Sequence, residues 1–173
     1  NISLLFASLY ATYSVIKFKN FYDILNQMMP KLLVLASQND NADIQSCSLF
    51  IIAKSLLNHH GLISNPNHFN EILSLIQNNI SSVTSQENKF SPYHKLVILD
   101  RTFHLLGRLI KCFEGEQMQL FLGENFQSVW EIFTYFFENF PIYRDEPSLI
   151  RIAFESINHL VQNLLPQFDS EII

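Results

Sequence analysis

The stretch PKLLVLASQNDNADIQSCSLFIIAKSLL, residues 30–57, decides the fold, because it places two apolar runs on either side of a short polar break. The second run, from Leu49 to Ala53 with Leu56, is apolar over a broader face than the single stripe of a surface helix. A helix needs this breadth when it contacts its own partner and a neighbour on each side. The stretch therefore predicts one helical hairpin in a row of hairpins, with SQNDNAD as its turn.

The helical pattern recurs along the whole chain. We expect helices over residues 2–18, 21–36, 44–59, 67–80, 93–113, 118–140 and 148–165, with a bend at Pro30 and stops at Gly61, Gly115 and Pro166. Each pair of helices takes about 45 to 50 residues, the period of two-helix solenoid repeats. The prediction is an all-α, right-handed α–α superhelix of about three and a half antiparallel hairpins.

The domain boundaries follow from this period. We expect a single α-solenoid segment over residues 1–173, with a partial hairpin over 1–20 and repeats over about 21–61, 67–115 and 116–166. A chain of 173 residues is long enough for one core and too short to argue for two. It begins at Asn1 in the middle of the pattern, so we also expect it to be a segment of a longer chain.

Composition narrows the class of protein further. Only 4 glycines and 6 prolines occur, which disfavours an all-β fold with its many tight turns. Charged residues make up only 16% of a chain with 16 phenylalanines, which predicts apolar surface that meets another protein or another part of a longer chain. The net charge of −5 argues against nucleic acid and anionic lipid as partners. The uncharged run Ser3 to Ile16 is shorter than the ~20 residues of a membrane span.

Two short features concern the compartment. Cys47 and Cys112 lie in apolar helical stretches without CxxC spacing, which predicts buried thiols in a reducing, intracellular environment. Asn-Ile-Ser triplets at Asn1 and Asn79 match the glycosylation pattern, although so short a motif also arises by chance in an asparagine-rich chain.

The spacing of the opening stretch resembles the HEAT repeat, which has a proline in its first helix, an aspartate in its loop and a Val-Arg pair opening its second helix. The matching positions here are Pro30, Leu33, Asp40, Ile44, Gln45, Ala53 and Leu56. Gln45 takes the place of the arginine, so the Asp–Arg ladder of the family lacks its arginine in this unit. Ile150 and Arg151 are similar to the Val-Arg pair, with Asp145 upstream, and the middle unit has Asp100 and Arg101.

The long aromatic-rich helices and the acidic balance look most like nuclear transport receptors of the β-karyopherin and exportin type. That resemblance implies a non-catalytic segment that binds cargo or a partner protein in the cytoplasm or nucleus, without a cofactor. Two other classes stay open. The segment could be a purely structural spacer of a large cytoplasmic scaffold, or a compact helical enzyme or ligand-binding domain.

The most distinctive local feature is the helix PYHKLVILDRTFHLLGRLIKCF, residues 92–113. One stripe is apolar and consists of Leu96, Leu99, Phe103, Leu106, Ile110 and Phe113. The opposite side gathers His94 and like-charged neighbours that repel each other by ~0.2–0.5 kcal/mol per pair, which suggests an acidic neighbour. We expect a partner-binding basic ridge, composed of Arg101, His104, Arg108, Lys111 and Arg151. The alternative is a solvated face neutralised by carboxylates of the next repeat, such as Glu155.

Three other groups of residues each allow two interpretations. His59, His60 and His68 could bind a metal, but adjacent histidines on a helix diverge by about 100°, which favours contacts at helix ends. Catalysis has no GxSxG elbow or glycine-rich phosphate loop to support it, and the acidic pairs Glu114–Glu116 and Asp145–Glu146 lie in loops. Aromatic residues at the sixth helix could line an apolar groove or pack in the core: Trp130, Phe133, Tyr135, Phe136, Phe137 and Phe140.

Overall fold

The computed structural model describes residues 2–16, 18–37, 40–64, 66–85, 89–112, 116–138 and 144–168, and within these ranges it is all-helical. The α-helices are α1 (Ile2–Val15), α2 (Tyr22–Ser37), α3 (Ala42–Asn58), α4 (Pro66–Thr84), α5 (Pro92–Lys111), α6 (Glu116–Glu138) and α8 (Pro147–Phe168). Short 3-10 helices η1 (Lys19–Phe21) and η2 (His60–Ser64) follow α1 and α3. The all-α prediction is confirmed for the described part of the chain.

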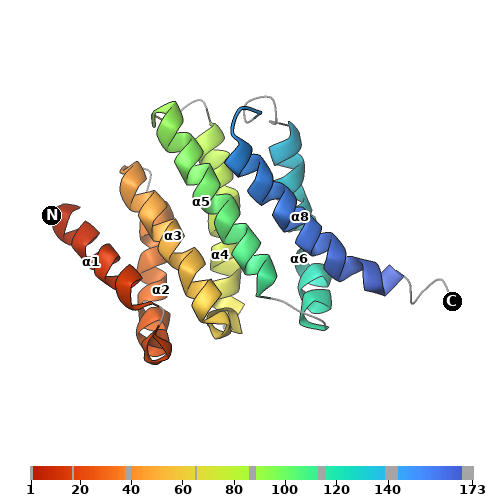
Figure 1. The fold of residues 1–173 in the computed structure, drawn as a ribbon, viewed down its shortest axis with the longest axis horizontal. Coiled ribbons are helices and arrows are strands. Elements are labelled where there is room, and N and C mark those ends of the chain that lie inside the picture. Colours follow the sequence, from red (N-terminus) through yellow and green to blue (C-terminus); the bar gives the residue numbers. More distant parts are fainter. Residues whose placement is uncertain are drawn as a thin grey trace.

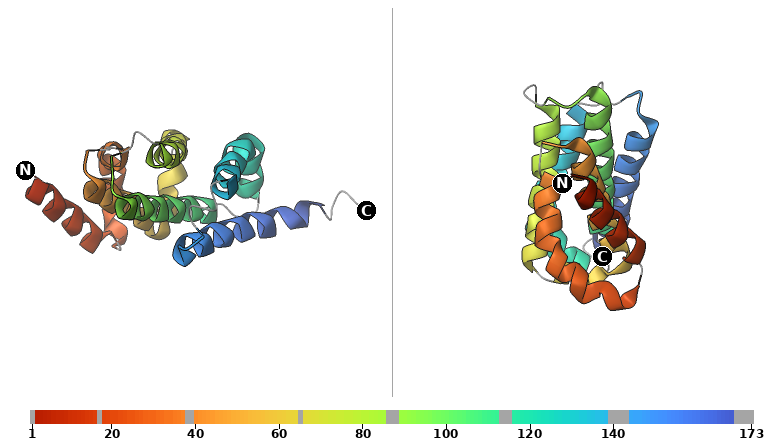
Figure 2. Two further views of the ribbon diagram at one scale, coloured as in Figure 1. Left: turned by 90° about the horizontal axis from the view of Figure 1, so that it is seen from above. Right: turned by 90° about the vertical axis from the view of Figure 1, so that its left-hand side faces the viewer.

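The helices stand side by side in two layers (Figures 1 and 2). The front layer contains α1, α3, α5 and α8, in which each helix contacts the next. The back layer contains α2, α4 and α6, and here α2 contacts α4. The layers are joined by contacts of α2 with α3, α4 with α5, and α6 with α8. Helices α1 and α8 lie at opposite ends of the row, so the described helices do not close around one centre (Figure 1).

Helix α3 occupies the position that the opening stretch predicts. It contacts α2 behind it and α1 and α5 on either side. Ten of its 17 residues are buried, including Leu49, Ile52 and Leu56 at full burial. This breadth of burial explains why its sequence is apolar at so many positions.

Helix α5 is the counterpart of α3 in the next pair and contacts α3, α4 and α8. Of the predicted apolar stripe, Leu99, Phe103, Leu106 and Ile110 are buried, Leu96 is half-buried, and Phe113 lies outside the described residues. The buried face is wider than the stripe, because contacts on three sides also bury Ile98, Thr102, Leu105 and Leu109.

Polar side chains cap the N-termini of the two central helices of the front layer, α3 and α5. Asn41 Oδ1 accepts hydrogen bonds from the backbone N–H groups of Asp43 and Ile44, both at 3.1 Å, and so caps α3. Ser91 Oγ accepts one from the backbone of His94 at 3.3 Å and caps α5. These bonds satisfy donors that have no partner within the first turn of a helix.

Helix α3 ends at Asn58 with His59 as its cap, within one residue of the predicted end, although Gly61 is not the residue that stops it. The His59 imidazole Nε2 donates to the Ile16 carbonyl at 2.7 Å, which ties the end of α3 to the end of α1. One predicted helix end is wrong. Helix α8 continues past Pro166 to Phe168, since a proline in the last turn interrupts few of the helical hydrogen bonds. Helix α2 is likewise continuous through Pro30.

A buried polar bridge joins three helices where the family pattern has an arginine. Gln45 Nε2 on α3 donates to Asn79 Oδ1 on α4 at 2.9 Å, and Asn79 Nδ2 donates to the Ala36 carbonyl near the end of α2 at 3.2 Å. All three residues are buried. In the apolar core each hydrogen bond offsets the cost of removing its polar groups from water. The bridge therefore favours one register of α4 against α2 and α3.

The buried polar bridge also determines whether the second Asn-Ile-Ser triplet, at Asn79, can be glycosylated in the folded chain. The nitrogen to which a glycan would be attached, Asn79 Nδ2, is used as a donor inside the core. Asn79 is only 2% exposed in the middle of α4. The folded chain therefore cannot be modified at Asn79, whereas Asn1 lies outside the described residues.

We expect Asn79→Ala to lower the free energy of unfolding by about 1–3 kcal/mol, because it leaves the Gln45 amide and the Ala36 carbonyl without this partner in the core. Urea unfolding followed by circular dichroism measures the change. The control is Asn78→Ala at the exposed neighbouring position, where a change within about 0.5 kcal/mol is expected. Equal effects of the two substitutions would show that the bridge contributes nothing.

Candidate partner-binding surface

The four predicted ridge residues of α5 lie on its exposed side. Arg101, His104 and Arg108 are partly exposed, and Lys111 at the end of the helix is exposed. They occur at spacings of three and four residues, which place their side chains one above another on the helix. Arg151, on the neighbouring helix α8, has a side chain that is 69% exposed.

The three arginines of the ridge lie around His104, across the two neighbouring helices α5 and α8. Partial burial lowers the pKa of its imidazole below the ordinary value of 6.5. The carboxylate of Asp100 acts in the opposite direction, and the charges of Arg108, Arg101 and Arg151 lower the pKa further. Three guanidinium groups therefore lie close enough to His104 to act on it, although Arg151 is on another helix.

Lys111 stands apart from this cluster. It lies in the last turn of α5, and its charge is not among those that shift the pKa of His104. Arg108 and Lys111 are both in that turn, where positive charge is stabilised by the carbonyl end of the helix dipole. This gives the two residues a structural role that does not require a partner.

Two carboxylates partly neutralise the ridge. Asp100 pairs with Arg101 at 3.8 Å, and Glu155 pairs with Arg151 at 3.9 Å. Both partners of the second pair lie on α8, so Glu155 neutralises the ridge at Arg151. Among the described residues, no carboxylate forms an ion pair with Arg108 or Lys111. The exposed Arg151–Glu155 pair contributes ~0–1 kcal/mol and can exchange with carboxylates from outside.

Asp145 and Arg151, the two positions of the last repeat that resemble the HEAT pattern, have different partners among the described residues. Asp145 pairs instead with its neighbour Arg144 at 3.7 Å, on the exposed surface. Arg151 is thereby left on the ridge, with Glu155 as its partner.

An aromatic residue that was not predicted from the sequence, Phe50, extends the ridge to the rest of the front layer. The guanidinium carbon of Arg101 lies 4.7 Å from the ring centroid of Phe50 on α3, within the range of a cation–π contact. Lys54 Nζ lies 5.7 Å from the same ring, and the ring of Tyr13 on α1 lies 5.5 Å from it. The spacing of Asp43, Cys47, Phe50 and Lys54 could have indicated this second stripe.

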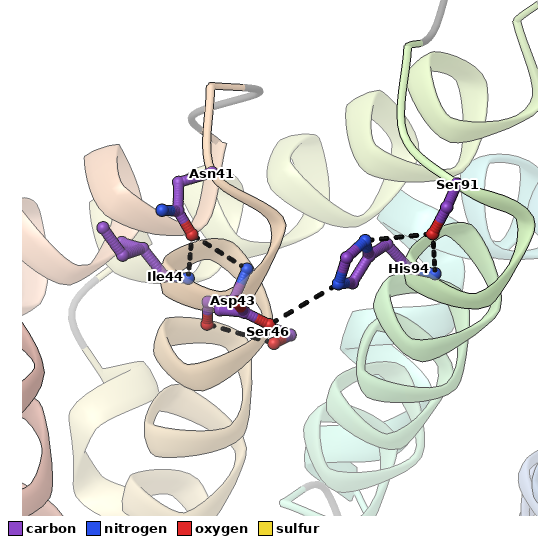
Figure 3. Close-up of polar contacts among 6 residues, drawn as sticks. All are labelled: Asn41, Asp43, Ile44, Ser46, Ser91 and His94. Carbon is purple, nitrogen blue, oxygen red and sulfur yellow. Dashed lines mark hydrogen bonds and ion pairs between the residues drawn. The ribbon is translucent and has the colours of Figure 1, made fainter.

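His94 also joins α5 to α3, at the beginning of both helices (Figure 3). Its Nε2 lies 3.7 Å from Asp43 Oδ1, and Ser91 Oγ lies 3.0 Å from the other ring nitrogen, Nδ1. His94 therefore belongs to a contact between the two helix ends and not to the ridge.

The other candidate residues have structural contacts. His59 is buried against the Ile16 carbonyl, His68 Nδ1 donates to the Leu62 carbonyl at 3.3 Å, and the exposed His60 donates to the Leu57 carbonyl at 3.1 Å. Within the described ranges no group of three or more metal-ligating side chains occurs. In that same part of the chain, every helix is too short or too polar to cross a membrane.

Both cysteines are free and half-buried, whereas the sequence predicted buried thiols. Burial raises the pKa of Cys112 to about 11, and its Sγ lies 3.8 Å from the Leu56 carbonyl. The pKa of Cys47 is also raised, by burial and by the charge of Asp43, against the opposing effect of Arg101. Both groups are therefore held as thiols, which are weak nucleophiles.

The aromatic run of α6 divides between core and surface. Phe133 and Phe136 are buried, and Phe136 packs edge-on against Phe103 of α5 at a centroid distance of 4.9 Å. Trp130 and Phe137 are exposed, whereas Phe140 lies outside the described residues.

Comparison of the chain with family models, curated proteins and solved structures finds no match.

We expect the imidazole of His104 to titrate below 6.5, measured by NMR on the folded protein with the urea-unfolded chain as reference. Because the unfolded state then binds more protons, stability rises with pH through this window and falls as pH drops through 6.5 toward the folded pKa. Arg108→Ala should raise the pKa only in part, since burial is the larger cause. A pKa of His104 at or above 6.5 would contradict the clustering of charges around it.

Proposed function

We propose that this chain is a non-catalytic protein-binding segment of an α-solenoid, HEAT-like in its hairpins, whose basic ridge binds an acidic partner protein. The row of helices supports the proposal, because stacked hairpins present an extended surface and not a closed cavity. The nuclear transport receptors that the sequence resembles supply the wider setting for such a segment. The basic ridge is the place where we expect contact.

The observation that carries the proposal is the concentration of positive charge on an acidic chain. The net charge is −5, yet Arg101 and Arg108 lie two turns apart on the exposed side of α5, and the adjoining helix α8 adds the exposed Arg151. Folding brings Arg151 to this place from a different hairpin, at an electrostatic cost. A patch of one sign speeds association with a patch of the other sign and suppresses like-charged partners.

The structural-spacer alternative has its own supporting observations. Arg101 and Arg151 have carboxylates nearby, and Arg108 and Lys111 suit the end of a helix. In that case the ridge would bind only adjacent parts of the same protein. The two proposals differ in whether the isolated segment binds an acidic peptide.

Reversing two ridge charges separates the proposals. We expect Arg108→Glu with Arg151→Glu to weaken binding of a fluorescein-labelled glutamate-rich peptide by about tenfold or more, measured by fluorescence anisotropy at low salt. Binding to the unaltered protein should also fall as salt is added. Helix content should not change, because both side chains are partly or largely exposed.

The matched control makes the same change of net charge elsewhere. Lys31→Glu with Lys89→Glu alters two exposed lysines, one on the back-layer helix α2 and one ahead of α5. Binding should be nearly unchanged in this control. Equal losses in both double variants would indicate an effect of net charge alone, and no binding by the unaltered protein would favour the spacer.

A further inference from the structure

A groove in the front layer lies beside the basic ridge, between α1 and α3. It has a volume of about 460 Å³, and its lining residues are Tyr13, Ser14, Ile16, Lys54, Leu57 and Asn58. Leu57 is 38% exposed and Tyr13 is 41% exposed, so apolar surface faces the opening. A volume of this size accommodates one large apolar side chain with part of its backbone.

Phe50 makes the groove and the ridge one continuous surface. Its ring lies 5.5 Å from the ring of Tyr13, and Lys54 Nζ lies 5.7 Å from its centroid; both residues line the groove. On its other side, Phe50 meets Arg101 of the ridge at 4.7 Å. A bound peptide that extends from the groove over Phe50 therefore reaches the guanidinium group of Arg101.

We infer that this surface binds a linear peptide segment with two features: an aromatic or branched aliphatic anchor in the α1–α3 groove and a run of carboxylates on Arg101, Arg108 and Arg151. The inference rests on the proposed function and adds the chemistry of the partner. Charge complementarity selects the acidic run, since Lys54 at the groove and the ridge are both positive. The anchor supplies the salt-independent part of the binding.

The arrangement of the helices sets the spacing between anchor and acidic run. From the gap between α1 and α3 to the gap between α5 and α8 is a distance of two helix spacings, since α3 and α5 lie between them. Packed helices lie 8–10 Å apart, and an extended chain advances 3.3–3.6 Å per residue, so the separation is about six residues. An anchor joined directly to the run places the first carboxylates over Lys54 and Phe50, so that fewer of them reach Arg108 and Arg151.

Three labelled peptides test the inference by fluorescence anisotropy. The first is a run of glutamates, the second adds a tryptophan through a glycine–serine spacer of about six residues, and the third joins the tryptophan directly to the run. Spaced peptides are made with the anchor at either end. We expect the spaced peptide to bind about tenfold more tightly than the glutamate run, and the directly joined peptide to show little of this gain.

Variants of the groove locate that gain. Ser14→Trp fills the groove at an exposed position and should reduce the spaced peptide to the affinity of the glutamate run. Leu57→Gln replaces an apolar side chain of the groove wall by a polar one of similar size, and it should also lower the affinity for the spaced peptide. The matched control is Ser74→Trp in the groove of about 490 Å³ between α2 and α4, on the back layer, which should change nothing.

The outcomes separate the inference from the function on which it rests. If all peptides bind equally, and only Arg108→Glu with Arg151→Glu weakens them, the groove has no role and the inference is overturned while the proposed function stands. If Ser74→Trp removes the gain as Ser14→Trp does, the assignment to the α1–α3 groove is overturned. If no peptide binds, or if charge reversal has no effect, both the proposed function and the inference fail.

Discussion

The structure depends on the requirement that each central front helix bury three sides at once. Helices α3 and α5 each contact one helix behind them and one on either side. Neither can shield its apolar surface within its own pair, so the free energy of burial is shared between neighbouring pairs. This is the reason that the pairs form a row, and that the core continues along the row instead of lying at one centre.

The same requirement concentrates the polar chemistry of the front layer. Three buried sides leave only a narrow exposed side on α3 and α5, and the charged residues of these helices must lie along it. Adjacent helices bring their exposed sides together, so Phe50 meets Arg101, and His104 comes under the influence of Arg151. The ridge is therefore a consequence of packing in the row.

Much of the fold could be predicted, because burial and helical period leave a direct record in the sequence. The breadth of Leu49–Ala53 predicted the three-sided burial of α3, and the spacing of Leu99, Phe103 and Ile110 predicted the buried face of α5. The predicted range 44–59 placed the end of α3 to within one residue, whereas the hydrogen bond of His59 was missed, since its acceptor Ile16 is distant in the chain. The ridge residues were found on their helices, whereas the contact with Phe50 and the Gln45–Asn79 bridge required the packing of neighbouring helices.

Small-angle X-ray scattering of the isolated chain tests the side-by-side arrangement most directly. A compact domain of 173 residues has a radius of gyration of about 16 Å. The row of helices predicts a clearly larger radius and an asymmetric distribution of interatomic distances with a long tail. A radius near the compact value with a symmetric distribution would contradict the arrangement, and with it the continuous surface from the α1–α3 groove to the basic ridge.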